Sequence, residues 1–129
     1  MRRPHLIILS CALLALGCSD LTAPSRLDGT WREESTIAGS GVEFTLATNG
    51  DAITGQGSWS GEACCSGTVT VAGTTTQGDV TLALSFVASD GRVPPFSETF
   101  TGRLSDANTL SGTIVTSTTS GSVVFTRIR

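Results

Sequence analysis

The feature that most constrains the fold is an alternation of apolar with small or polar residues, interrupted by turn residues. Val80, Leu82, Leu84 and Phe86 occupy every second position of one such stretch. A period of two places these side chains on one face of a β-strand. Turn residues recur roughly every eight to twelve positions, and no stretch shows the longer period of a helix. The pattern predicts an all-β chain built from hairpins.

The turns divide the chain into eight predicted strands. Asn49-Gly50, between the second and third strands, is a strong hairpin signal because both residues accept a positive φ. Eight consecutive strands with one apolar face predict an antiparallel up-and-down barrel, which has no free edges. A two-sheet β-sandwich explains the same pattern and is the alternative. The predicted strands span 29–35, 42–47, 52–59, 67–74, 80–87, 96–104, 109–117 and 122–128.

Glycines also lie inside the predicted strands, among them Gly55, Gly57, Gly102 and Gly112. Glycine inside a strand marks a sharp bend or the close approach of another group. We expect that the barrel strands coil at these positions, or that a large neighbouring side chain takes the space.

The first residues combine two arginines with an apolar run from Leu6 to Leu16, followed by Gly17-Cys18. This order of charge, short apolar run and small residue is that of a secretory signal peptide. The run is too short for a bilayer-spanning helix, which needs about twenty residues. The sequence resembles a bacterial lipoprotein signal, in which a small residue directly precedes an obligatory cysteine.

The lipoprotein resemblance implies cleavage after Gly17 and acylation of Cys18 by fatty acids such as palmitate. It implies attachment to a membrane through this N-terminal lipid, and Ser19 after the cysteine favours the bacterial outer membrane. An ordinary signal peptide, in which Cys18 has no such role, is the alternative. The predicted organisation is a signal peptide at 1–17, a flexible tether at 18–26 and one barrel domain at 27–129.

Composition excludes several functions for the chain after Gly17. These 112 residues hold six arginines, no lysine and eleven acidic residues, so no nucleic-acid partner is expected. The only histidine, His5, belongs to the predicted signal peptide. No Ser–His pair, imidazole metal site or Schiff-base lysine is therefore available. The acids are dispersed and single out no catalytic carboxylate pair. We expect no enzyme activity, no metal and no cofactor.

Gly29-Thr30-Trp31 opens the first predicted strand, and Arg127 lies on the last. In both respects the chain resembles the calycins, the group of lipocalins and avidins, whose barrels begin with Gly-x-Trp and carry a late arginine. In that family the arginine lies across the tryptophan and helps to close the base of the barrel. The resemblance implies that Arg127 stacks on Trp31, a cation–π contact worth roughly 0.5–2 kcal/mol.

The resemblance does not extend to the ligand of the avidins. Those proteins present an Asn and a Ser shortly after the opening tryptophan, whereas this chain has Arg32, Glu33 and Glu34. Avidins also line their site with several tryptophans and a tyrosine, and this chain has two tryptophans and no tyrosine. Biotin binding is not expected.

Cys64-Cys65 is the most unusual local feature and lies between the third and fourth predicted strands. The expected compartment is oxidising, so thiols tend to pair. With Cys18 acylated and Cys11 removed, the two have only each other within the chain. A disulfide between adjacent cysteines is strained and more easily reduced, as a redox switch requires. A simple loop staple, free thiols and an intermolecular bond are the alternatives.

Trp59 ends the third predicted strand in phase with Ile53. At the mouth of a barrel it would form an aromatic wall for a small ligand. The alternative is a core tryptophan whose N–H donates to a carbonyl.

Glu98 lies in phase with Phe96 and Phe100, which predicts an inward side chain. A buried carboxylate needs a partner or acquires a raised pKa, and Arg103 or Arg32 could be that partner. A bulge that turns Glu98 outward is the alternative.

Two functions follow as hypotheses. The first is a lipid-anchored barrel that binds a small apolar ligand. The second is a structural or interaction protein, such as an inhibitor of an envelope protease. A hollow barrel favours the first hypothesis, and a filled barrel with a projecting loop favours the second.

Overall fold

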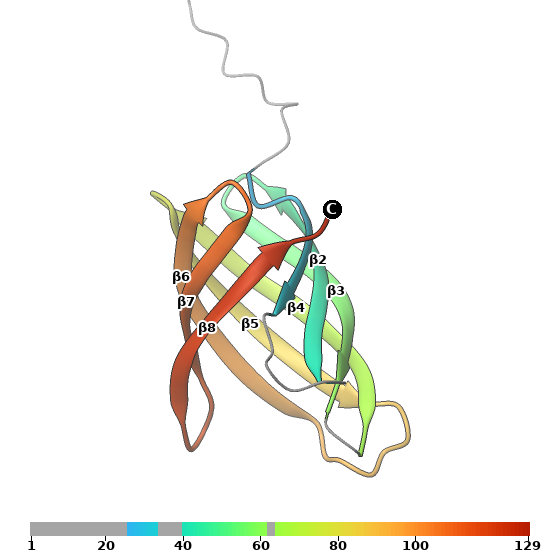
Figure 1. Cartoon of the computed structure of the whole chain (residues 1–129). Coiled ribbons are helices and arrows are strands. Elements are labelled where there is room, and N and C mark those ends of the chain that lie inside the picture. Colours follow the sequence, from blue (N-terminus) through green and yellow to red (C-terminus); the bar gives the residue numbers. More distant parts are fainter. Residues whose placement is uncertain (1–25, 34–39, 62–63) are drawn as a thin grey trace, which may run out of the picture.

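The computed structural model describes residues 26–33, 40–61 and 64–129, and every regular element in these ranges is a β-strand (Figure 1). The strands are β1 (Gly29–Glu33), β2 (Gly41–Asn49), β3 (Ala52–Ser60), β4 (Ser66–Thr76), β5 (Asp79–Ala88), β6 (Phe96–Asp106), β7 (Thr109–Val115) and β8 (Ser120–Arg127).

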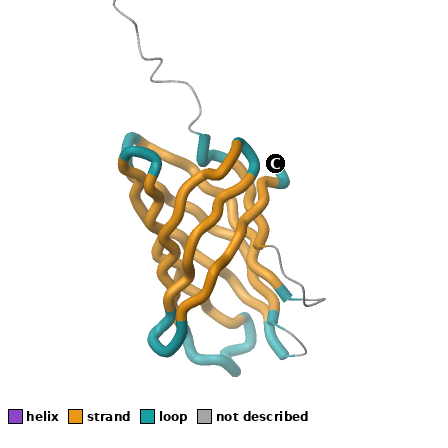
Figure 2. Tube along the Cα trace, turned by 60° about the vertical axis from the view of Figure 1, so that its left-hand side comes forward, coloured by secondary structure: helices purple, strands orange, loops and turns teal. Residues whose placement is uncertain are grey.

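The eight strands form one closed barrel (Figure 2). Each strand pairs antiparallel with the next, and β8 pairs with β1 to complete the circle. The closing register places Trp31 opposite Arg127 and Glu33 opposite Phe125. The predicted up-and-down barrel is confirmed. The sandwich alternative is wrong, because a continuous ladder leaves no division into two sheets. The barrel is consistent with the calycin-like fold that the resemblance implies.

The predicted strand ends agree with the observed ones to within two residues wherever both are described. The predicted end of the first strand, Ser35, lies outside the described residues. β7 ends at Val115 and not at position 117, because Thr116 begins a turn. Its amide donates to the carbonyl oxygen of Thr119 at 2.8 Å, and its hydroxyl accepts from the Thr119 amide at 3.0 Å.

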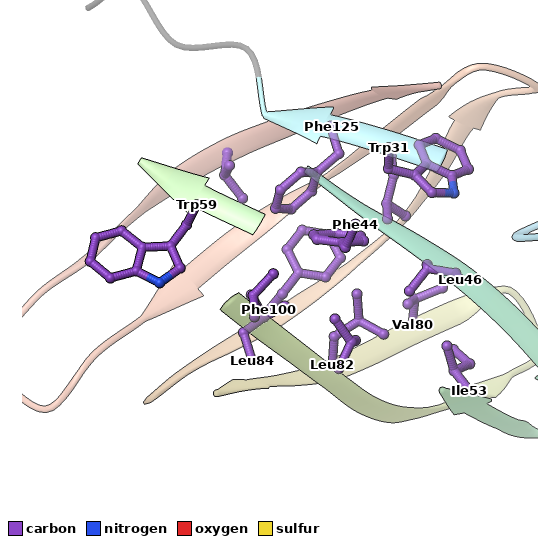
Figure 3. Packing of buried hydrophobic residues seen from close by; sticks show 14 of the residues in the cluster. Trp31, Phe44, Leu46, Ile53, Trp59, Val80, Leu82, Leu84, Phe100 and Phe125 are labelled. Carbon is purple, nitrogen blue, oxygen red and sulfur yellow. The ribbon is translucent and has the colours of Figure 1, made fainter. Parts of the chain in front are cut away.

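The alternation on β5 fills the barrel interior. Val80, Leu82, Leu84 and Phe86 are each at most 2% exposed, as their period of two predicts. At the centre of the barrel the Phe125 ring contacts two others, with centroids 5.0 Å from Phe44 and 5.4 Å from Phe100. Figure 3 shows these rings between the two tryptophans, which lie at opposite ends of the cluster.

Gly102 and Gly112 make room for one of the central rings. They face each other across β6 and β7. A Cβ on Gly112 would lie 2.7 Å from the Cα of Gly102 and 2.8 Å from Cε2 of Phe100. Both distances are shorter than real Cβ contacts. The Phe100 ring can therefore pack directly on the two glycines only because neither has a side chain.

The two ends of the barrel differ. The start of β1 and the end of β8 meet at one end, together with tight turns at 50–51, 77–78 and 107–108 (Figure 1). We call this the closed end. At the other end the connections are longer, among them 89–95 and 116–119. We call this the open end, and the difference decides where a ligand could enter.

Candidate functional site

A cavity of about 500 Å³ occupies the open end of the barrel. Every strand except β4 contributes to it, because β1, β3, β5 and β7 end there and β2, β6 and β8 begin there. Its apolar wall includes Val42, Leu84, Ile114, Val123 and Phe125. Hydroxyl groups line the same cavity. They belong to Ser40, Ser60, Thr116, Thr119, Ser120 and Ser122.

Three aromatic rings form one wall of this cavity. Phe86 and Phe96 are stacked, with centroids 4.7 Å apart and planes inclined by 6°. Trp59 meets both edge-on, at 6.2 Å from Phe86 and 5.5 Å from Phe96. Its indole N–H donates to the Val87 carbonyl oxygen at 3.3 Å. Trp59 is therefore a buried residue whose N–H donates to a carbonyl, as the core interpretation predicts, and it also lines the cavity.

Glu98 also lines the cavity, opposite Leu84 in the register of β5 and β6. The two arginines suggested as its partners pair elsewhere. Arg103 Nη2 lies 2.7 Å from Asp79 Oδ1, and Arg32 Nη2 lies 2.8 Å from Glu43 Oε2. Neither of the two suggested arginines therefore pairs with Glu98. The reason is that both arginines point outward from their strands.

Glu33, which is not among the site residues predicted from the sequence, lines the same cavity as Glu98. The signal was present, because Glu33 follows Trp31 by two residues and so shares its inward face. Among the acidic residues that the structure describes, Glu33 and Glu98 thus lie in one cavity. No basic residue lines the cavity among the described parts of the chain.

Burial raises the pKa of both carboxyl groups above the ordinary value. For Glu33 the cause is desolvation. For Glu98 desolvation is the larger cause, and the negative charge of Glu33 raises its pKa further. The site therefore contains two half-buried carboxylates that repel each other. Within the described ranges no group of three His, Cys, Asp or Glu could hold a metal ion.

Cys64 and Cys65 are joined by a disulfide in the connection between β3 and β4. The Gly61 amide donates to the Cys65 carbonyl oxygen at 2.7 Å, which closes the base of this connection. Cys65 also packs against the hydrophobic core. The pair lies at the open end but does not line the cavity.

The closed end is held by Trp31 and Arg127. The guanidinium carbon of Arg127 lies 4.4 Å from the Trp31 ring centroid, in the arrangement that the calycin resemblance implies. The Trp31 indole N–H donates to the Leu27 carbonyl oxygen at 2.9 Å. Arg127 also donates to the backbone carbonyl oxygens of Arg26 and Asp28. The Arg127 side chain thus connects the residues that precede β1 to the last strand, β8.

Cys18, the predicted signal peptide and all of the predicted tether except Arg26 lie outside the described residues. No helix long and apolar enough to span a membrane occurs in the described part of the chain. Comparisons with protein-family models, with curated proteins and with solved structures found no match.

The closed-end contact predicts coupled losses of stability. Trp31→Ala removes a fully buried ring and should cost roughly 3–5 kcal/mol. Arg127→Ala should cost less. Because the groups touch, the double variant should lose less than the sum of the two single losses. Urea denaturation of the four proteins measures this coupling.

Arg103→Ala is the control for these variants and should change stability little. Its ion pair with Asp79 is exposed and should contribute about 0–1 kcal/mol. Strictly additive losses for Trp31 and Arg127 would contradict the closure of the barrel by this contact.

The two cavity carboxylates, Glu33 and Glu98, are predicted to lower the stability of the fold at neutral pH, where they are ionised. Their pKa values are higher in the folded than in the unfolded state, so protonation favours folding. Their stabilising effect is complete below the unfolded pKa and is lost as the pH rises through the folded pKa. Glu33→Gln and Glu98→Gln should therefore each raise Tm by a few degrees at neutral pH. The gain should vanish at about pH 3, where carboxyl groups are protonated.

Glu43→Gln is the matched control, because Glu43 is paired with Arg32 and should show no gain. Thermal melts at both pH values test the prediction. A fall in Tm for either cavity variant at neutral pH would show that its carboxylate stabilises the fold.

Proposed function

We propose that this protein is a lipid-anchored binding protein of the bacterial cell envelope, which takes a small, largely apolar ligand into the open end of its barrel. The cavity is the observation that carries the proposal. Its volume of about 500 Å³ falls within the range of small-molecule sites, roughly 300–1,000 Å³. The proposed activity is binding without a catalytic step.

The lining of the cavity supports this proposal. Aromatic and aliphatic side chains form most of the wall, and a few hydroxyl groups and two carboxylates add polar contacts. This combination is typical of ligand sites, where apolar area provides affinity and a few polar groups fix orientation. The filled central layer below the cavity gives it a floor, which includes the Phe125 ring.

The position of the residues that precede β1 supports the proposed anchor. Arg26 lies at the closed end, where its carbonyl oxygen accepts a hydrogen bond from Arg127. Cys18 precedes it by eight residues, a span of at most about 29 Å when extended. An acylated Cys18 would hold the barrel by its closed end, so the cavity would open away from the membrane.

The second candidate is an interaction protein, such as an inhibitor of an envelope protease. The exposed connection 89–95, which contains Pro94-Pro95, is the observation that favours it. Such a protein would act through this surface and would leave the cavity without a ligand. Probe binding separates the two candidates.

A neutral apolar probe should bind the cavity. We expect N-phenyl-1-naphthylamine, which fluoresces strongly in apolar sites, to bind with a stoichiometry of one. Ile114→Trp should abolish most of this binding, because Ile114 lines the cavity and the larger side chain fills it. Fluorescence titration measures the loss.

Val115→Trp is the matched control, because the neighbouring Val115 points outward and is 47% exposed. This variant should bind the probe as the parent does. Absence of binding to the parent protein, or equal binding by both tryptophan variants, would reject a ligand site in the barrel.

The proposed anchor depends on one sulfur atom. Cys18→Ser should abolish the incorporation of labelled palmitate in bacterial cells and leave the precursor uncleaved by the lipoprotein pathway. A variant with Cys64→Ser and Cys65→Ser should be labelled as the parent is. Labelling of the Cys18→Ser variant would show that the lipid is attached elsewhere or that the segment is not a lipoprotein signal.

A further inference from the structure

The charges of the cavity are unbalanced. Glu33 comes from β1 and Glu98 from β6, and they are the only titratable side chains among the described residues that line it. The nearest charged groups on β1 and β2, Arg32 and Glu43, pair with each other on the outer surface. The cavity therefore contains two carboxylates and no described cation.

A ligand that fills this cavity must remove water from both carboxylates. For an uncharged ligand this removal is unfavourable, because a buried carboxylate without a partner loses its hydration and gains nothing in return. A positive charge on the ligand compensates for the lost hydration and relieves the repulsion between Glu33 and Glu98. An anion would increase that repulsion.

The aromatic wall favours the same kind of ligand. The faces of Trp and Phe rings carry partial negative charge and attract cations, and sites for quaternary ammonium groups use such rings. Trp59, Phe86 and Phe96 line the cavity together with the carboxylates. Phe96 precedes Glu98 by two residues on β6, so the ring and the carboxylate project from the same face of one strand.

We propose that the cavity selects an organic cation, an amine or quaternary ammonium compound with a small apolar body. This inference rests on the proposed ligand-binding function and specifies the chemical class of the ligand. The carboxylates provide the counter-charge, and the rings and aliphatic side chains contact the apolar body.

A matched pair of competitors tests the inference. Benzyltrimethylammonium and neopentylbenzene have nearly the same shape and differ in the central nitrogen and its charge. We expect the cation to displace bound N-phenyl-1-naphthylamine at a concentration at least tenfold lower than the neutral compound. In water an apolar cavity without charges prefers the neutral compound, so a preference for the cation reports the carboxylates.

The double variant Glu33→Gln with Glu98→Gln should lose the preference for the cation, measured as the ratio of the displacing concentrations of the two competitors, in which a change of probe affinity cancels. Its control is Asp51→Asn with Asp79→Asn, which removes the same number of charges at the closed end. This control should keep the preference. A second arm uses the parent protein, in which the preference should decline as the pH falls and the two carboxyl groups become protonated. Benzyltrimethylammonium keeps its charge at every pH, so this change can only come from the protein.

The outcomes separate the inference from the function on which it rests. If the parent protein does not bind the probe, the proposed function fails. If the probe binds but the cation competes no better than its neutral isostere, or displaces nothing, the cation inference alone is rejected. It is also rejected if the glutamine double variant retains the preference.

Discussion

The contact between Arg127 and Trp31 determines how the two ends of this barrel differ. It joins the first strand to the last, where the circle of strands closes, and Arg127 also binds the backbone carbonyl oxygens of Arg26 and Asp28. A guanidinium group can serve several such acceptors because it carries five donors in a fixed plane. The cavity of about 500 Å³ lies at the other end, where the connections are longer, and a smaller hollow of about 400 Å³ lies at the closed end beside Leu27 and Val80.

The strands and turns could be predicted from the sequence because their determinants are local, whereas the choice between barrel and sandwich depends on the distant pairing of β1 with β8. The alternation at Val80, Leu82, Leu84 and Phe86 requires a one-faced strand, and Asn49-Gly50 suits a tight hairpin. The end of β7, like the ends of β2, β4 and β6, could be predicted only to within two residues. A run of threonines can continue a strand or bond its own backbone in a turn, and at Thr116 the turn prevails. Propensity alone does not decide between these two conformations.

The candidate site could be predicted only in part, because a cavity depends on which side chains meet across distant strands. The inward direction of Glu98 can be predicted from its position in the alternation of one strand. The residues that surround it cannot, because they come from other strands. Arg103 and Arg32 were plausible partners by residue type, yet both face outward and pair with acids on adjacent strands. Glu33 is brought into the cavity with Glu98 by closure of the barrel. The sequence left open whether the barrel is hollow or filled with side chains. Each alternative describes one region, since the centre is filled and the open end is hollow.

The proposed function places a ligand beside Trp59, at the end of the barrel opposite to the contact between Trp31 and Arg127. The chain has only these two tryptophans, so their indole N–H groups give two signals in a ¹⁵N–¹H NMR spectrum. On titration with N-phenyl-1-naphthylamine the Trp59 signal should shift, because this ring lines the cavity. The Trp31 signal should remain in place, because its N–H donates to Leu27 at the opposite end. A shift of the Trp31 signal alone, or of neither signal at saturating probe, would contradict the account.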